Sequence, residues 1–346
     1  MEQKSILNIK PLGFPWETQD PFIFCVHHRD EFPKGNAEMG PAVSLEGRNI
    51  GQDFTIKDGW RMYHGETIPG FPYHPHRGFE TVTVVKEGLV DHTDSMGASG
   101  RFGKGDVQWM TAGKGVLHSE MFPLVNEDKG NPMELFQIWL NLPKKAKFVE
   151  PHFKMLWEDS IPVLKETNTN GKSVEINIVA GTLYNLTAPA PTPDSWAANP
   201  QNEVAILTIK LEVGASWVLP KASENANRTL YFYKGKGLQI DGETIPANHS
   251  IQVKPDNDLT LQAESEDCFM LMLQGKPINE PVVQYGPFVM NSEDEIREAF
   301  QEYKRTQFGG WPWPKHEQAH ERNKERFAIY ADGREEIKPR KKDYTD

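Results

Sequence analysis

Four side chains in the first half of the chain have the types and the spacing of a set of metal ligands. His74 and His76 are separated by one residue, and His118 and Glu120 repeat that spacing farther along the chain. Successive side chains of an extended strand point to opposite faces, so residues i and i+2 point the same way. Two paired strands with these sequences would direct three imidazoles and one carboxylate towards a single point.

This donor set suits one divalent ion of borderline or fairly hard character, such as iron(II), manganese, nickel, cobalt or zinc. Four protein ligands leave two open positions on an octahedral ion, and open positions are what a catalyst needs. A closed structural zinc site is the competing interpretation, but such sites are typically rich in thiolates and none of the four residues is cysteine. We prefer a metal site to ordinary surface or core histidines because the two pairs of residues have the same i, i+2 spacing.

Other polar residues near these four differ in how well they suit a ligand role. Glu80 lies four residues beyond His76 on the same strand parity, so it is a candidate for a fifth ligand or for a carboxylate that supports one. Several histidines have no paired neighbour in a comparable setting, and we leave them outside the site: His27, His28, His64 and His92.

Glycines precede His118 in two short clusters, 103–105 and 113–115. A phosphate-binding loop would need a helix directly after the glycines, and the sequence shows none here. Tight turns at the rim of a β-structure explain the clusters better, because glycine accepts a positive φ and lets the next strand return with His118 facing inward.

The elements that would position these residues are short strands. Runs rich in β-branched and aromatic residues alternate with Gly, Asp and Asn breaks, as in an all-β sandwich or barrel: Thr81–Val85, Asp106–Met110 and Leu135–Leu140. A second block has the same character and looks like a second copy of the first: Val174–Val179, Leu230–Tyr233 and Cys268–Met272. The polar connection that starts at Pro143 breaks the pattern between the two blocks.

The end of the chain predicts a helix followed by an extended segment. Ser292 and Glu295 form a capping box, and an apolar face follows over residues 293–306. Trp311–Pro314 should then pack as an extended aromatic segment on the same molecule, and a proline-rich ligand for a partner is the alternative. We therefore expect three parts: an N-terminal metal-binding barrel at 1–150, a C-terminal barrel without a metal site at 170–290, and a helix with a tail at 291–346.

Charge and composition exclude several classes of function. The formal net charge is -11, which opposes binding to nucleic-acid phosphates and to anionic membrane surfaces. The sequence has neither a signal-peptide pattern nor a long apolar run, so we expect a cytoplasmic protein. Cys25 and Cys268 should be buried thiols, and the basic run 338–342 should be a solvated end.

A His-x-His strand followed some forty residues later by a glycine turn and a histidine resembles the cupin barrels. More narrowly, residues 74–83 and 105–113 resemble the pirin family, and the similarity continues through His118–Glu120 and 137–143. It resumes at Phe308–Trp313, which is similar to the ending of many bacterial pirins. The resemblance covers most of the chain.

Membership of this family would imply an all-β fold with two cupin β-barrels, a bicupin, followed by a C-terminal helix and an extended tail. In pirins one metal ion, usually taken to be iron, sits on the residues that match His74, His76, His118 and Glu120, and all four are present. The second barrel is expected to have lost its site. Its sequence agrees, because residues 214–221 contain no His-x-His and His249 stands alone.

Several bacterial pirins are known as quercetin 2,3-dioxygenases, so the resemblance implies an oxidoreductase that opens flavonols with O2 and releases carbon monoxide. Its substrate would be a small aromatic molecule, its cofactor Fe(II) or another transition metal, and Glu120 would accept the proton of the 3-hydroxyl. The alternative is a non-enzymic regulator that senses metal or redox state and binds a protein partner. Sugar isomerisation and seed storage fit the barrel but not these motifs.

Overall fold

The protein is built mainly from β-strands, as the sequence predicts. The structure is a computed structural model, and it describes residues 4–168 and 171–339. Each of the six predicted runs lies within or largely within a strand. The expected all-β fold with a C-terminal helix is confirmed. No helix in the described part of the chain is long and apolar enough to cross a membrane.

The chain divides into two compact units. We call the unit with His27–Gln137, Lys144–Glu158 and the chain from Glu280 the N-terminal barrel. The C-terminal barrel contains Ile138–Pro143, Asp159–Asn279 and the first segment up to Val26. The units therefore interleave along the chain. The sequence predicts instead that each part is one uninterrupted segment (1–150, 170–290 and 291–346). These boundaries stay a prediction.

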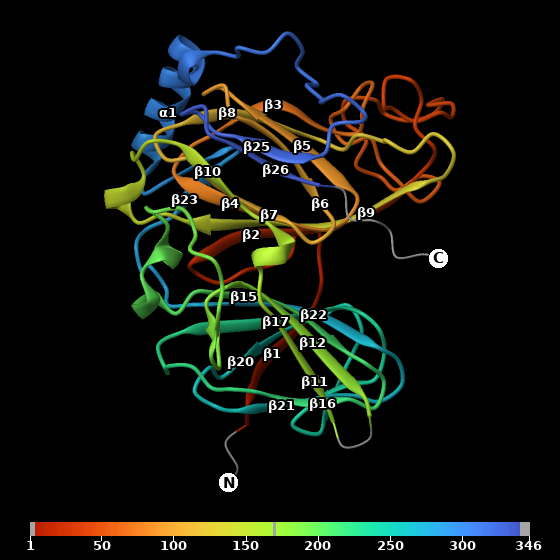
Figure 1. Cartoon of the computed structure of the whole chain (residues 1–346). Coiled ribbons are helices and arrows are strands. Elements are labelled where there is room, and N and C mark those ends of the chain that lie inside the picture. The colour runs from red at the N-terminus through yellow and green to blue at the C-terminus, as the bar shows by residue number, and fades with distance from the viewer. Residues whose placement is uncertain (1–3, 169–170, 340–346) are drawn as a thin grey trace. The chain divides into compact units, whose positions relative to one another are not determined.

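Two main sheets form the N-terminal barrel (Figure 1). The first has the order β10 (His152–Leu156), β7 (Val107–Thr111), β4 (Phe79–Glu87), β9 (Asn131–Asn141) and β2 (Phe22–Phe32). The second has the order β26 (Glu335–Lys338), β25 (Arg326–Ile329), β6 (Ser99–Gly103), β5 (Leu89–Asp94), β8 (Val116–Met121) and β3 (Gly70–His76). A small hairpin pairs β23 (Val283–Tyr285) with β24 (Phe288–Met290).

The C-terminal barrel also has two main sheets. The larger has the order β1 (Ile6–Pro11), β20 (His249–Val253), β17 (Asn227–Lys234), β22 (Cys268–Gly275), β15 (Ala205–Leu211), β12 (Ser173–Ala180) and β11 (Val163–Thr167). The smaller has the order β16 (Ser216–Leu219), β21 (Leu259–Ala263), β18 (Leu238–Ile240) and β19 (Glu243–Ile245). A short hairpin joins β13 (Thr182–Leu183) to β14 (Leu186–Thr187).

Strict alternation in the strands of the C-terminal barrel builds its core. In β16 Trp217 and Leu219 are buried, whereas Ser216 and Val218 are exposed. Because strand side chains alternate between faces, each strand contributes every second residue to the shared apolar cluster. The predicted buried thiols are also confirmed, since Cys25 and Cys268 are both free and buried.

The C-terminal helix has the predicted bounds. α1 covers Glu293–Thr306, and the Ser292 side chain accepts a hydrogen bond from the Glu295 N–H at its first turn. Its buried face contains Ile296 and Ala299, which join a cluster with Phe288. Short 3-10 turns occur elsewhere in the chain: Lys144–Ala146, Glu158–Ser160, Trp196–Ala198, Pro200–Asn202 and Gln307–Gly309.

The chain beyond the helix packs against the N-terminal barrel. Trp311 stacks on Tyr73, with ring centroids 5.3 Å apart, and Trp313 Nε1 donates to the Asp94 carbonyl oxygen at 2.8 Å. The predicted packing of the aromatic segment on the same molecule is thus confirmed. The sequence predicts only an extended tail. In the structure the tail also contains a strand, β25, which pairs with β6 and extends the second sheet. Of the basic run, residues 340–342 lie outside the described residues.

One buried ion pair ties this C-terminal segment to the sheet. Arg101 on β6 donates to both carboxylate oxygens of Asp91 on β5, at 2.6 and 2.7 Å. The same guanidinium donates to the carbonyl oxygens of His320, Glu321 and Lys324. The side chains of Arg101 and Asp91 are at most 1% exposed, so the loss of either partner would leave a buried charge without compensation.

We expect Arg101→Met to lower the free energy of unfolding by about 3–5 kcal/mol. The substitution leaves the buried Asp91 carboxylate without its cationic partner and removes the hydrogen bonds to the carbonyl oxygens of the tail. Denaturant titration monitored by tryptophan fluorescence measures the change. The double variant Arg101→Met with Asp91→Asn removes both charges and should recover part of the loss. Equal destabilisation of the single and double variants would contradict the role given to the buried charge.

Candidate metal centre

Two paired strands carry the predicted ligands. β3 and β8 are antiparallel neighbours in one sheet, and β5 lies on the other side of β8 (Figure 1). His74 stands directly opposite His118, and Phe71 stands opposite Glu120. The register shifts by one residue between Phe71 and His74. The expected arrangement of two paired strands that carry these residues is therefore present.

Three imidazoles converge at the centre of this pairing. One nitrogen from each of His74, His76 and His118 lies within 4.8 Å of the others, and the Nε2 atoms of His74 and His76 are 3.1 Å apart. His76 and His118 are buried, and His74 is half-buried. Glu120 is not a member of this group, although it is on the same strand as His118.

The hydrogen bond of His74 fixes its tautomer. Its Nδ1 lies 2.8 Å from the carbonyl oxygen of Pro72, and a carbonyl oxygen can only accept. Nδ1 therefore carries the hydrogen, and Nε2 presents a lone pair towards His76. This arrangement, in which the outer ring nitrogen donates to the protein, is the one that orients histidines that bind metals.

His118 tests whether the cluster fits a cation. Both of its ring nitrogens are buried, and neither has a hydrogen-bond partner among the described residues. Buried polar groups without a partner are unfavourable and rare. A divalent ion between the three imidazoles would satisfy the nitrogen that faces them, so the residues present fit a metal ion.

Burial makes these imidazoles neutral at pH 7. It lowers the pKa of His74 to about 4. Burial and the neighbouring histidines hold the pKa values of His76 and His118 well below the usual value of 6.5. A neutral imidazole has the lone pair that a metal requires, so the three side chains need not release protons before they bind an ion.

A hydrogen-bond network holds the Glu120 carboxylate. Gln137 Nε2 on β9 donates to Glu120 Oε2 at 2.7 Å, and Thr83 Oγ1 on β4 lies 3.0 Å from Glu120 Oε1. Burial raises the pKa of Glu120 despite these contacts. Reasoning from the sequence did not identify Thr83 or Gln137 as partners of Glu120. Each is a polar residue between two apolar neighbours in a strand, and this is the sequence signal that could have identified it.

Glu80 belongs to a different environment from the histidines. It accepts a hydrogen bond from Thr111 Oγ1 at 2.7 Å, and the two residues are paired across β4 and β7. The expected strand parity from His76 to Glu80 does not hold, because Gly78, at a φ of +85°, separates β3 from β4. Glu80 is not a member of the histidine group.

The histidines expected outside the site are also outside this group: His27, His28, His64 and His92. His92 is nevertheless close, with its ring centroid 5.6 Å from that of His118, and its Nε2 lies 3.3 Å from Asp94 Oδ2. The others contact separate partners: His27 with Glu134, His28 with Tyr63, and His64 with the Gly51 carbonyl.

Turns that require glycine precede the second ligand strand. Gly113 and Gly115 have φ values of +47° and +133°. A Cβ atom on Gly113 would lie 2.1 Å from the carbonyl oxygen of Val149, so the turn excludes any side chain at this point. These glycines therefore serve as tight turns that return the chain to β8, as the sequence predicted.

Comparison with known proteins agrees with this geometry. A family model described as Pirin matches residues 17–140, and one described as the Pirin C-terminal cupin domain matches residues 206–309. The chain belongs to the pirin family. Its expected organisation as two cupin domains is confirmed.

Three known proteins are similar to this chain. A pirin-like protein of tomato is 37% identical over 238 residues, which cover 68% of this chain and 75% of that protein. A Pseudomonas aeruginosa protein, named provisionally as a quercetin 2,3-dioxygenase, is 35% identical over 240 residues, or 68% of this chain and 79% of that protein. The solved structure of quercetin 2,3-dioxygenase from Acinetobacter baumannii matches with a TM-score of 0.69 and 26% identity, covering 88% of this chain and 98% of that one.

We expect His118→Gln to lower the affinity of this pirin for Ni(II) or Fe(II) by at least about 100-fold, because even outer partners of ligands contribute about 10–100-fold. Titration calorimetry, with metal content measured after dialysis, reports the change. His249→Gln removes an imidazole from the C-terminal barrel and should leave the affinity unchanged. Equal metal content in the two variants would contradict the proposed centre.

The lowered histidine pKa values also predict a pH dependence of stability. Below pH 6.5 the unfolded chain protonates these imidazoles, whereas folded His74 binds a proton only near pH 4. The free energy of unfolding of the metal-free protein should therefore fall as the pH falls from 6.5 towards 4, by up to about 1.4 kcal/mol per unit for each histidine. Urea titrations in the presence of a chelator measure the change in the free energy of unfolding per pH unit. His118→Gln should reduce this change by the contribution of one histidine.

Proposed function

We propose that this pirin is a metal-dependent dioxygenase that opens flavonols such as quercetin with O2 and releases carbon monoxide. The observation that carries the proposal is the convergence of three neutral imidazoles in the same sheet as a buried, hydrogen-bonded carboxylate. The names of the Pseudomonas and Acinetobacter relatives support the reaction class. The proposed ligands are His74, His76, His118 and Glu120, and the preferred ion is Fe(II), although other transition metals suit the same donors.

A divalent ion at this site would supply Lewis acidity towards an ionised hydroxyl of the substrate. The chain itself supplies the proton acceptor, Glu120. Burial raises the pKa of this carboxylate, which makes it a stronger base than an exposed glutamate. Its proposed role is to accept the proton of the flavonol 3-hydroxyl, which gives Glu120 a place both among the ligands and in catalysis.

Thr83 allows the network to serve both protonation states of Glu120. Its hydroxyl oxygen lies 2.6 Å from Gln137 Oε1 as well as 3.0 Å from Glu120 Oε1, and one hydroxyl has one hydrogen to donate. When Glu120 is ionised, Thr83 can donate to it, and the contact between Thr83 Oγ1 and Gln137 Oε1 must then lengthen because it has no hydrogen. When Glu120 has taken up a proton, Thr83 can accept from Glu120 and donate to Gln137. The carboxylate can thus gain a proton without losing its position.

Aromatic side chains provide apolar surface next to the histidines. The ring centroid of Phe79 lies 5.0 Å from that of His76, and that of Phe71 lies 6.2 Å from that of His74. Phe79 is fully buried, whereas Phe71 is half-buried. We propose that Phe71 contacts the flat aromatic substrate and that Phe79 keeps water from the inner side of the cluster.

Quercetin consumption in air by Fe(II)-loaded protein tests this function. We expect loss of flavonol absorbance together with release of carbon monoxide, and no turnover by His118→Ala. Glu120→Gln should lower kcat by about 10²–10⁴-fold, the usual contribution of a general base. His249→Ala is the matched control and should retain turnover. Metal content is measured for every variant, so that loss of the ion is distinguished from loss of the base.

Failure of this experiment has a definite meaning. If the protein contains one metal ion per chain but does not consume quercetin, the proposed metal centre stands and the proposed flavonol substrate is wrong. The alternative function, a metal- or redox-sensing regulator that binds a protein partner, would then take first place.

A further inference from the structure

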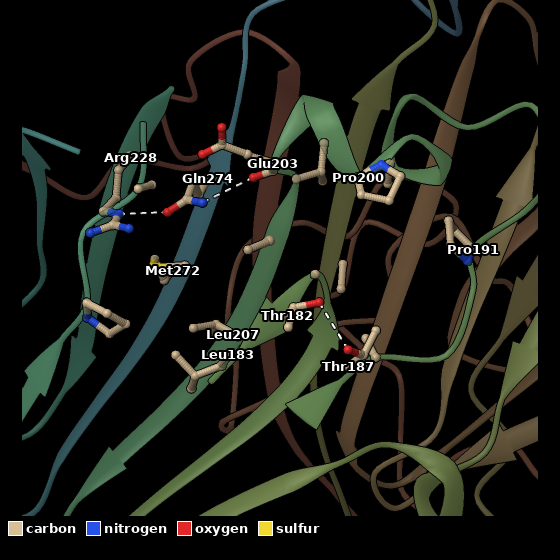
Figure 2. A pocket seen from close by; sticks show the side chains of 18 of the residues that line it. Thr182, Leu183, Thr187, Pro191, Pro200, Glu203, Leu207, Arg228, Met272 and Gln274 are labelled. Atoms are coloured by element: carbon tan, nitrogen blue, oxygen red, sulfur yellow. Dashed lines mark hydrogen bonds between the residues drawn. The ribbon is translucent and has the colours of Figure 1, made fainter. Parts of the chain in front are cut away.

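The C-terminal barrel contains a cavity of about 410 Å³ at one end of its larger sheet. Small aliphatic and proline side chains form most of the wall, and Leu207 and Met272 connect it to the core of the barrel (Figure 2). Other lining residues, such as Thr182 and Lys221, are exposed. The cavity therefore leads from the surface towards the core, and its volume lies in the range of small-molecule sites.

A charged residue occupies a position in this wall where the strand pattern calls for an apolar one. On β17 the core-facing row contains Leu230 and Phe232, and Arg228 is the next member of the same row. Arg228 is paired in register with Gln274 on β22, just as Leu230 is paired with Met272. The inner face of the sheet thus changes from apolar to polar at the cavity.

Arg228 is only partly satisfied by the protein. Its Nε donates to Gln274 Oε1 at 2.7 Å, and Gln274 is held in turn because its Nε2 donates to the Glu203 carbonyl oxygen at 3.1 Å (Figure 2). Arg228 is 3% exposed, and its terminal Nη1 is buried without a hydrogen-bond partner among the described residues. An oriented guanidinium edge is therefore available at the wall of the cavity.

No carboxylate of the described residues forms an ion pair with Arg228. The nearby acid that lines the cavity, Glu203, is instead engaged by Lys276 Nζ at 2.9 Å and by the Ser223 N–H at 3.0 Å. Burial lowers the pKa of Arg228 to about 10 although the charges of Asp258 and Glu203 raise it, so Arg228 stays protonated at pH 7. Because neither carboxylate forms an ion pair with this buried cation, the site favours an anion that enters from outside.

The walls limit which anion would fit. Guanidinium groups bind planar carboxylates through two parallel hydrogen bonds, and the apolar lining suits a carboxylate that carries a hydrophobic body. We propose that the C-terminal barrel binds a small organic carboxylate with an apolar body, with the carboxylate on Arg228 and the body against Leu207 and Met272. This site is separate from the histidine cluster, which belongs to the other barrel.

Hydrogen bonds fix the loop that closes one side of this cavity. Trp196 Nε1 donates to the Lys276 carbonyl oxygen at 2.9 Å, and Asn202 Nδ2 donates to the Trp196 carbonyl oxygen at 2.8 Å. Residues 188–191, part of a proline-rich segment, also contribute to the lining. The cavity is thus formed by anchored segments, as a preorganised binding site requires.

Benzoate is the probe for this proposal, and benzamide is its neutral counterpart. Titration calorimetry or saturation-transfer NMR on the full-length protein should show benzoate binding that is at least about tenfold tighter than benzamide binding, because only the anion pairs with the guanidinium. Arg228→Met should weaken benzoate binding at least about tenfold and remove the preference over benzamide. Lys236→Met removes a cation from the surface of the same barrel and should change neither value.

A second variant keeps the proposal testable if Arg228→Met does not fold, which thermal unfolding will show. Ala222→Leu narrows the cavity and leaves Arg228 in place, so it should also weaken benzoate binding. Three results would overturn the proposal: no benzoate binding, unchanged binding in a folded Arg228→Met or Ala222→Leu variant, or inorganic phosphate that binds as tightly as benzoate. None of these results depends on metal content or on quercetin turnover.

Discussion

The antiparallel pairing of β3 with β8 is the constraint on which the candidate metal centre depends. It places His74 opposite His118 and so brings together nitrogens that are more than forty residues apart in the chain. A register slip of one residue would turn every side chain of a strand to the other face and disperse the cluster. Gly70 begins β3 with a φ of +134°, and a Cβ atom there would lie 2.5 Å from the carbonyl oxygen of Glu120. Close approach of the backbones thus helps to set the register.

Burial then gives the paired side chains their chemical character. The same desolvation that lowers the histidine pKa values raises that of Glu120, because in each case the charged form is disfavoured. The result is a set of neutral nitrogen donors in the same barrel as a carboxylate of increased basicity. The polar network of Thr83 and Gln137 keeps that carboxylate hydrogen-bonded. Shielding from water, rather than a nearby charge, is the main cause of these shifts.

The two barrels share an architecture but use their inward faces differently. In the N-terminal barrel the strands that face the interior carry imidazoles and a carboxylate, which suit a cation. In the C-terminal barrel the corresponding interior is an apolar cluster, and the buried charge at the wall of its cavity is a cation, Arg228, which suits an anion. Residues 170–290 contain no His-x-His, and the carboxylate site proposed at Arg228 would give this barrel a chemistry of its own.

The sequence alone determined the features that arise from local rules. Strand alternation put His74 and His76 on one face, and the capping box at Ser292 predicted the bounds of the helix. Only the tertiary structure decided what lies across from each strand. Thr83 and Gln137 reach Glu120, and Arg228 stands at the wall of a cavity, through pairings between distant segments that no local pattern specifies. Alternation fixes the direction of a side chain within its own strand, but the fold chooses its neighbours and the depth at which it is buried.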